Sequence, residues 1–501
     1  MKASAALAIA VFALTATARA QDNRPVAFTN ARLVVIDGPV IERGTMVVKN
    51  GTILSIGKDA VAPAGALTVD CKGGTVMPGL VSAFSRAGLT APPRMPQQVD
   101  GGVRRGRRGG NPFAGMEAPR AGVQNQAATK IVERLDAKQD VFIELLRSGI
   151  TTLSLVPNAS GFGGLGALLK PDGKTLETLT AKDDAFVFIG MARENATKKL
   201  LKENFDKAKK IVEERKKPKE VPKPAEPKPA DQPADAAKPG DKPVETPKPG
   251  DKPPEPKPEP KPEPKPEPKP EPKPEPKPEP KPEPKPEPKK DGQTPPAQQP
   301  PAQAQKPEEK KDPNLEVLAD LLEGRRRAII QIDSSADLLH WTHACGEDLS
   351  FPRAIATSRF DPQSGTFDDA DAIEAVKKLK SPLLLPPTLS TRPRTRYLTN
   401  PAKTLHDAGL EIGFQIGDTR DAARTLFFQL MELCRHGLPA DVALAGVTLV
   451  PAKMLGVDGE VGSLKVGKQA NLLVFSGNPL DATSELRSVW LSGKQVPMTQ
   501  L

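Results

Sequence analysis

The sequence predicts an α/β protein that combines a (β/α)8 TIM-like barrel, a small β-sandwich domain formed by both chain ends, and a disordered proline-rich insertion. Apolar runs with turn signals lie at both ends, strand-like and helix-like runs alternate between them, and a proline repeat interrupts the alternation. Such alternation is typical of a parallel sheet, and the number of units suits an eight-stranded barrel. The expected parts are residues 21–78 and 455–501 for the sandwich, 79–216 and 312–454 for the barrel, and 217–311 for the insertion.

Residues 1–20 have the features of a secretory signal peptide. Lys2 provides a positive start, the apolar run 5–14 is too short to span a bilayer, and residues 18–20 have the small-x-small form of a cleavage site. No later run in the sequence is long and apolar enough for a membrane helix. We therefore expect a periplasmic or secreted protein without a membrane span.

The two ends of the remaining chain both indicate short strands. The dipeptide Asn50-Gly51 between alternating apolar residues is a strong hairpin signal. Strand segments at opposite ends of a chain often pair into one small domain, with the middle inserted between them. The expected strand regions are 26–36, 45–57, 67–79, 461–477 and 487–496.

The middle of the chain predicts alternating helices and strands. The glycine-rich stretch 161–166 matches no phosphate-binding motif, and Lys170 beside it is interpreted as a loop residue at the mouth of the barrel, with contact to an anion as the alternative. The expected strands are 150–157, 186–190, 328–332, 353–357, 382–386 and 410–417, and the expected helices are 127–147, 192–217, 314–324, 335–345, 369–380, 401–408 and 420–436.

The insertion contains the unit PEPK, repeated without error from Pro254 to Lys289. Alternate prolines remove backbone donors and restrict φ, so the segment is expected to adopt polyproline II and to bury nothing. An exposed insertion that grew by repeat slippage is the favoured interpretation. A proline-reading partner for this segment, or a role as a spacer in the cell envelope, is the alternative.

The formal net charge of +10, with basic clusters at 104–108 and 325–327, raises the question of nucleic-acid binding. The sequence has no nucleic-acid motif, and its single tyrosine, Tyr397, leaves few stacking platforms. We therefore expect no nucleic-acid partner.

Nucleophilic schemes find little support in the sequence. No serine lies in a G-x-S-x-G elbow, and the widely spaced Cys71, Cys345 and Cys434 indicate separate thiols rather than a disulfide framework or a zinc pattern. His340 and His343 share a helix face, but that helix is expected outside the barrel, which favours ordinary polar residues over a metal pair.

Four regions of the sequence carry a resemblance to a known family: 49-KNGTILSIG-57 with 75-TVMPGLVSA-83, 147-RSGITTLSLVPNASGFGGLGALLK-170, 409-GLEIGFQIGDTRDA-422 and 437-GLPADVALAGVTLVPAKMLGVDGEVGSLKVGKQANLLVFSG-477. On these motifs the chain resembles the amidohydrolase superfamily, in particular its exported, imidazolonepropionase-related branch. The resemblance implies a barrel that hydrolyses carbon–nitrogen bonds in cyclic amides with zinc or another divalent metal, whose bound water is the nucleophile.

The same resemblance identifies where the metal ligands should stand. It implies two histidines on the first strand, one on each of the fifth and sixth, and an aspartate on the eighth. Phe84 and Arg86 occupy the first two positions, Asp333 the third, and no histidine ends the run 353–358. Only Asp418 is retained. We therefore expect four vestigial metal-ligand positions, with no bound metal or other cofactor.

Arg86 brings a permanent positive charge to a position that a cation has vacated. We expect its guanidinium to pair with Asp333 or Asp418, within about 4 Å of a carboxylate oxygen, while Phe84 fills the remaining volume. The favoured function is a non-catalytic binding or partner role, beside an intact paralogue or a second copy of the chain. The alternatives are an active hydrolase of carbon–nitrogen bonds that uses Asp418 as its base, and a cell-envelope spacer.

Overall fold

The computed structural model describes residues 24–90, 125–217, 311–346, 349–357, 367, 369–392 and 394–498, which belong to one compact unit. The expected signal peptide, the PEPK repeat and most of the stretch 91–126 lie outside the described residues.

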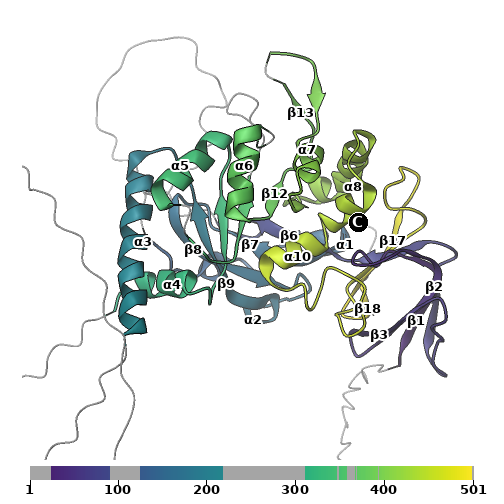
Figure 1. Cartoon of the computed structure of the whole chain (residues 1–501). Coiled ribbons are helices and arrows are strands. Elements are labelled where there is room, and N and C mark those ends of the chain that lie inside the picture. The colour runs from purple at the N-terminus through teal and green to yellow at the C-terminus, as the bar shows by residue number, and fades with distance from the viewer. Residues whose placement is uncertain are drawn as a thin grey trace, which may run out of the picture. The chain divides into compact units, whose positions relative to one another are not determined.

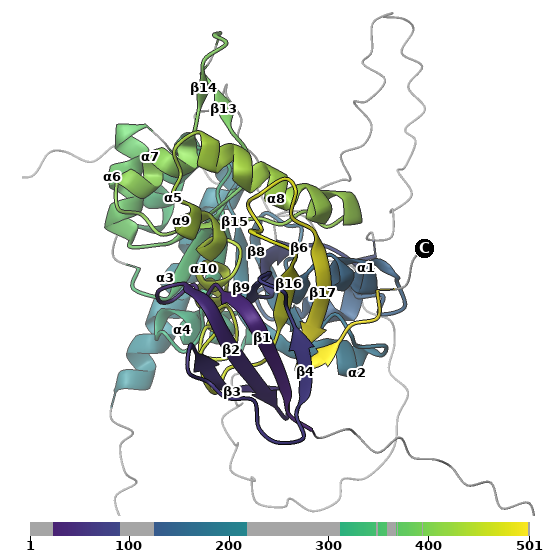
Figure 2. The same cartoon turned by 90° about the vertical axis from the view of Figure 1, so that its right-hand side faces the viewer.

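The larger part of this unit is a mixed α/β fold around a curled eight-stranded sheet (Figures 1 and 2). All neighbouring strands are parallel except that β8 runs antiparallel to both β7 and β9. The strand order is β15 (Ile412–Phe414), β12 (Leu383–Leu385), β11 (Arg353–Ala356), β10 (Ala328–Gln331), β9 (Thr180–Gly190), β8 (Gly161–Leu169), β7 (Ile150–Leu155) and β6 (Leu80–Ser85).

The two edge strands of this sheet are connected by a short segment rather than by direct pairing. The carbonyl of Gly446 accepts a hydrogen bond from Phe414 N in β15 (2.6 Å), and the carbonyl of Val447 accepts one from Val81 N in β6 (3.0 Å). The expected all-parallel barrel is thus corrected in two respects, because one strand is antiparallel and residues 446–447 lie between the edges.

The glycine-rich stretch 161–166, for which we expected no strand, is part of β8, whose nine residues are all buried. A Cβ atom at Gly166 would lie 2.1 Å from the Phe186 ring, so the absence of a side chain lets this aromatic residue of β9 pack on β8. Because β8 is antiparallel, its last residue, Leu169, pairs with Thr180 at the start of β9. Lys170 therefore lies at the amino ends of the parallel strands, and its expected place at the barrel mouth is wrong.

The expected helix 127–147 is a second correction. The structure has a 3₁₀ turn at Ile131–Arg134 and a short helix α1 (Val141–Arg147) instead. Lys130 forms a bridge with Leu165 of β8, and Leu135 is extended and bridges Leu89. Pairing with these neighbours explains why helical periodicity over 127–140 does not produce a continuous helix.

The other expected helices are confirmed within a few residues. Helices α4 and α5 pack against α3, and α6 packs against α5 (Figure 1). The helices are α2 (Leu176–Leu179), α3 (Asn195–Lys216), α4 (Pro313–Leu322), α5 (Ser335–Cys345), α6 (Ala370–Leu379), α7 (Pro401–Asp407), α8 (Arg420–Arg435), α9 (Ala440–Ala445) and α10 (Leu449–Leu455). No helix in the described part of the chain combines the length and the apolar character needed to cross a membrane.

Strands from both chain ends form a second eight-stranded sheet. Asn50 (φ 52°) and Gly51 (φ 80°) are both left-handed at the β2–β3 turn, as the Asn-Gly signal predicts. In the expected strand region 461–477, only β16 is a strand. The order is β18 (Lys494–Gln495), β17 (Leu486–Leu491), β16 (Leu472–Phe475), β5 (Thr75–Pro78), β1 (Val26–Leu33), β2 (Ile41–Lys49) and β3 (Thr52–Gly57), and β4 (Leu67–Asp70) also pairs with β1.

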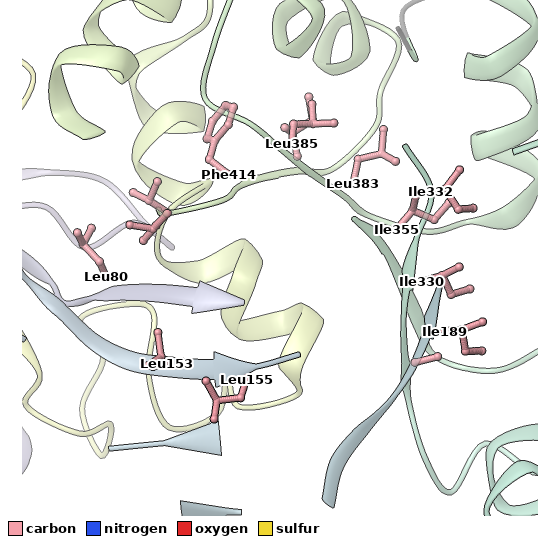
Figure 3. Close-up of a cluster of buried hydrophobic side chains, with 14 of the residues drawn as sticks. Leu80, Leu153, Leu155, Ile189, Ile330, Ile332, Ile355, Leu383, Leu385 and Phe414 are labelled. Atoms are coloured by element: carbon pink, nitrogen blue, oxygen red, sulfur yellow. The ribbon is translucent and has the colours of Figure 1, made fainter. Parts of the chain in front are cut away.

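Side-chain alternation along the curled sheet separates two buried clusters. One face carries the cluster in Figure 3, which includes Leu80, Ile330 and Phe414. The other face carries Phe84 and Phe188, which pack in a cluster with residues of α10. Phe84 is thus a core residue, and the polar groups that follow it along the chain lie at the rim of this core.

Candidate functional site

The candidate site lies where β6, β10 and β15 end. Phe84 is in β6 and Arg86 follows it directly, Asp333 stands two residues after β10, and Asp418 follows β15. Parallel strands present their carboxyl ends at one edge of a sheet, which is where sites form in this architecture. The four vestigial positions expected from the sequence therefore belong to one edge.

Asp418 is hydrogen-bonded to the residues at the end of β6. Its Oδ2 accepts a hydrogen bond from the backbone N–H of Arg86 (2.8 Å), and it also interacts with the hydroxyl of Ser85. Ser85 Oγ accepts the backbone N–H of Ala87 (3.1 Å), which shapes the same turn. The carboxylate thus connects the last and the first strands of the sheet through the main chain.

The guanidinium of Arg86 reaches Asp333 through an amide. Arg86 Nη2 donates to Gln331 Oε1 (3.2 Å), and Gln331 Nε2 donates to Asp333 Oδ2 (3.0 Å). Among the described residues, no side-chain ion pair within 4.0 Å joins Arg86 to Asp333 or Asp418. The direct pair that we expected is therefore wrong: the side chain of Gln331, the last residue of β10, lies between the two charges.

The sequence analysis missed Gln331. The available signal was a single amide at the end of the apolar strand 328-AIIQ-331, two residues before Asp333. Residues i and i+2 of an extended segment face the same side. An amide can donate to a carboxylate and accept from a guanidinium at once, so it suits this position.

The charged residues of this site are half-buried, and their charges are incompletely compensated. Burial lowers the pKa of Arg86, and the charges of Asp418 and Asp333 only partly oppose this. Burial raises the pKa of Asp418, against the hydrogen bonds from Ser85 and Arg86 N–H and the Arg86 charge. Arg86 Nε and Asp418 Oδ1 are buried without a hydrogen-bond partner in the described structure. Phe84 contacts the guanidinium, with 5.3 Å between the ring centre and Cζ.

This donor set does not fit a divalent metal. Phe84 has no lone pair, and Arg86 places a permanent positive charge where the cation would sit. In the described part of the chain, no three His, Cys, Asp or Glu side chains are grouped so that they could hold a metal ion. His340 and His343 lie on α5, and no third ligand accompanies them among the described residues.

The cysteines are unbridged and poorly suited to nucleophilic chemistry. Burial raises the pKa of Cys71 to about 11 and that of Cys345 to about 12, and it also raises the pKa of Cys434. The reactive species is the thiolate, so these thiols are inert near neutral pH.

Two cavities lie away from this edge. One of about 620 Å³ is lined by residues of α1, α8 and the β16–β17 connection, including Arg420, Phe427 and Phe475. The other, of about 520 Å³, lies beside Lys170 and Asn471. Neither includes a residue of the Arg86 cluster, which is the set Phe84, Arg86, Gln331, Asp333 and Asp418.

Comparison with known proteins addresses the family. The sequence model of the amidohydrolase family matches residues 397–496. Amidohydrolase tasK from Hapsidospora irregularis is 30% identical over 99 residues, which are 19% of this chain and 10% of the relative, so the chain spans about a tenth of the length of that curated protein. The crystal structure of an amidohydrolase from Thermotoga maritima superposes with a TM-score of 0.59 at 19% identity, over 94% of this chain and 99% of the other, which shows a shared fold.

Proposed function

Because this chain is a member of the amidohydrolase superfamily, we propose that it is a catalytically degenerate member with a binding or partner role. One observation carries the proposal: the guanidinium of Arg86, hydrogen-bonded to Gln331, stands at a position where the family resemblance implies a histidine ligand. The mechanism of such hydrolases depends on metal-bound water. A half-buried cation at a ligand position opposes metal binding by charge repulsion.

Elemental analysis of the purified chain tests this proposal. We expect no stoichiometric divalent metal, even after incubation with zinc and gel filtration. One equivalent of a divalent metal, removed by a chelator together with a hydrolytic activity, would contradict the proposal.

A variant of the same chain provides a matched positive control. The double substitution Phe84→His and Arg86→His removes the cation and places two imidazoles beside Asp418, the smallest change that creates a three-ligand set. We expect this variant to bind zinc more tightly than the wild type by competition with a chromogenic chelator. Equal zinc uptake by both proteins would show that Arg86 does not determine metal binding.

A second candidate function is an active hydrolase that uses Asp418 as a general base. The raised pKa of Asp418 supports it, because a base works best when its pKa approaches the working pH. Cyclic amides are the substrates to test, since the imidazolonepropionase-related branch would act on their carbon–nitrogen bonds. This function requires a turnover that Asp418→Asn abolishes, with kcat/KM rising as pH passes the pKa of Asp418.

Several finer proposals accompany the main one. The two chain ends form a composite β-sandwich, the signal peptide at 1–20 directs the protein to the periplasm or the exterior, and the partner is an intact paralogue or a second copy. N-terminal sequencing of the exported protein checks the cleavage site. A third function, a cell-envelope spacer, predicts that deletion of 217–311 abolishes envelope association, whereas the partner proposal predicts no such loss.

A further inference from the structure

A β-hairpin projects from the carboxyl edge of the curled sheet, after β12. It consists of β13 (Ser390–Thr391) and β14 (Leu398–Thr399), paired antiparallel (Figures 1 and 2). In both views it extends beyond α7 and the neighbouring helices. It therefore belongs to the same edge as the Arg86 cluster and reaches away from the body of the fold.

Hydrogen bonds join several of the described residues at the exposed end of the hairpin. Arg392 N donates to Tyr397 O (3.0 Å), and Thr395 N donates to Arg392 O (3.1 Å). The hydroxyl of Thr395 also accepts from Tyr397 N (3.2 Å). These bonds connect the two sides of the hairpin next to its exposed arginines.

The base of the hairpin is anchored in the fold. Ser390 and Asn400 are buried. Asn400 Nδ2 donates to the carbonyls of Leu433 (2.9 Å) and His436 (3.3 Å) at the end of α8, and its Oδ1 caps α7 by accepting from Lys403 N. The projection is thus fixed to two helices.

The tip of the hairpin is positively charged, and the sequence around it contains no acidic residue. Arg392, Arg394 and Arg396 are exposed, and residues 386–400 contain no aspartate or glutamate. No ion pair in the described structure involves these three arginines. Beside them Tyr397 is 74% exposed and Leu398 is 57% exposed. Arginine and tyrosine are the residues most enriched among interface hot spots.

We propose that the described residues of the hairpin, 390–392 and 394–399, form a docking element for an acidic protein surface. The arginines recognise carboxylates, since a guanidinium binds them through two parallel hydrogen bonds. Tyr397 and Leu398 supply the apolar contact that becomes buried. A nucleic acid would require a longer basic stripe with several aromatic residues, and this tip offers three arginines and one aromatic ring. The inference rests on the proposed partner role and identifies where the partner is held.

Tyr397 offers a direct readout, because it is the only tyrosine of the chain. Nitration by tetranitromethane therefore reports on one site. The probe is a synthetic peptide of alternating glutamate and leucine, and the comparison ligands are the same peptide with lysine for glutamate and a short single-stranded DNA. We expect the acidic peptide to bind and to slow nitration of Tyr397, with weaker effects at high salt.

Two triple variants separate the hairpin from general charge. Arg392→Gln, Arg394→Gln and Arg396→Gln together should weaken peptide binding by about tenfold or more. The control Lys202→Gln, Lys207→Gln and Lys210→Gln removes the same charge from the exposed face of α3 and should change binding by less than about twofold. Unchanged melting temperatures of both variants establish that they are folded.

Three outcomes overturn the inference: no binding of the acidic peptide to the wild type, equal loss in the two triple variants, or stronger protection of Tyr397 by DNA than by peptide. The proposed function is tested separately: a stoichiometric metal together with turnover would contradict it. Neither of these two measurements depends on the nitration of Tyr397. Hairpin failure in a protein without metal or turnover would leave the partner role but exclude this docking surface.

Discussion

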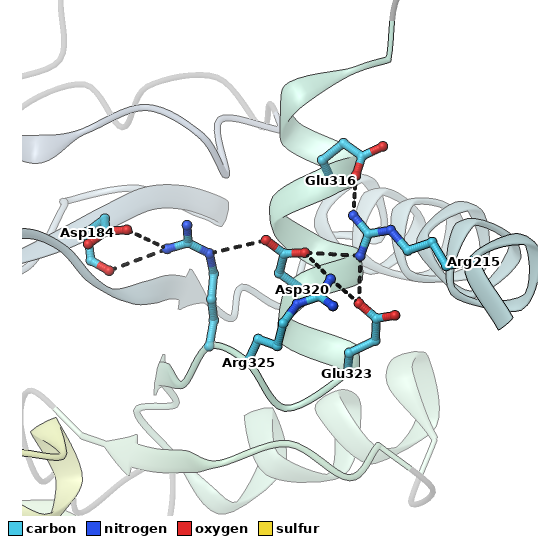
Figure 4. Close-up of polar contacts among 7 residues, drawn as sticks. Asp184, Arg215, Glu316, Asp320, Glu323 and Arg325 are labelled. Carbon is cyan, nitrogen blue, oxygen red and sulfur yellow. Dashed lines mark hydrogen bonds and ion pairs between the residues drawn. The ribbon is translucent and has the colours of Figure 1, made fainter.

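Two charged clusters of this molecule handle their charges in opposite ways. In the Arg86 cluster only Phe84 is buried and the polar residues are half-buried; the guanidinium of Arg86 donates to an amide, and only its main-chain N–H meets a carboxylate. The second, which we name the Arg215 network, lies between α3 and α4 and joins arginines directly to acids (Figure 4). Its members are Arg215, Arg325, Arg326, Asp184, Glu316, Asp320 and Glu323.

The contacts of the Arg215 network are numerous and partly exposed to solvent. Arg215 binds Asp320 (3.0 Å) and Glu323 (2.6 Å), as well as Glu316, and its side chain is 27% exposed. Burial opposes the charge of Arg215, but hydrogen bonds to Asp320, Glu316 and Glu323 raise its pKa. α3 ends at Lys216 and α4 begins at Pro313, so the network ties together the two points where the chain leaves for the insertion and returns.

This comparison indicates that the number of ion pairs in a cluster does not determine how much stability is lost when one interaction is removed. Partly exposed charges can exchange a lost partner for water, which limits what each pair contributes. Buried charges cannot, so a single interaction there has a larger effect when it is removed. Three sets of variants test this contrast and are given in order of decreasing effect.

Arg86→Met should destabilise the protein by about 3 kcal/mol, because Asp418 and Asp333 would lose the nearby cation and one oxygen of Asp418 is buried without a hydrogen-bond partner. Urea unfolding measures this loss. The double variant Arg86→Met/Asp418→Asn should recover part of it, since the asparagine can still accept from the main-chain N–H of residue 86 without carrying charge. A loss below about 1 kcal/mol would mean that these carboxylates are already neutral or hydrated.

Arg215→Met should destabilise by about 1–2 kcal/mol at low salt, since three carboxylates lose a shared donor while Arg325 and Arg326 remain. The difference from wild type should shrink in 1 M NaCl, where the Debye length is about 3 Å. The Arg86 difference should not shrink. As a control, Lys199→Met removes one exposed pair with Glu203 and should cost about 0.3 kcal/mol. Equal salt sensitivity of the Arg86 and Arg215 variants would remove the contrast.

The smallest expected effects are pH dependences of opposite sign. Burial disfavours the charge of Asp320, but Arg325 and Arg215 outweigh it and lower its pKa, so its contribution to stability is present above pH 3.8 and is lost as pH falls through the folded-state pKa. The pKa of Asp418 is raised by burial, so its contribution is present below pH 3.8 and is lost as pH rises through the folded-state pKa.

Unfolding free energies of wild type, Asp320→Asn and Asp418→Asn between pH 3 and pH 7 check these signs. On acidification, wild type should lose stability relative to Asp320→Asn and gain it relative to Asp418→Asn, by about 1 kcal/mol or less in each case. The same sign for both aspartates would contradict the assignment of one site as compensated and the other as desolvated.

The sequence predicted most elements well because their signals are local. Helix α5 agrees with the expected range 335–345, and the Asn50-Gly51 turn agrees in conformation. Strand β8 was missed because a glycine-rich segment has neither alternation nor β-branched residues, and its burial depends on Phe186 of the neighbouring strand. The helix over 127–140 was wrong because pairing with Leu165 and Leu89 overrides helical periodicity.

From the sequence alone, the family resemblance proposed four positions for the candidate site, Phe84, Arg86, Asp333 and Asp418. Only the tertiary structure decided how they contact one another. Arg86 and Gln331 are 245 residues apart, and Arg86 and Asp418 are 332 apart. Their contacts follow from which side chains of β6, β10 and the segment after β15 face the same side of the curled sheet, and from the space that Phe84 leaves. Those are properties of packing, and no local pattern in the chain encodes them.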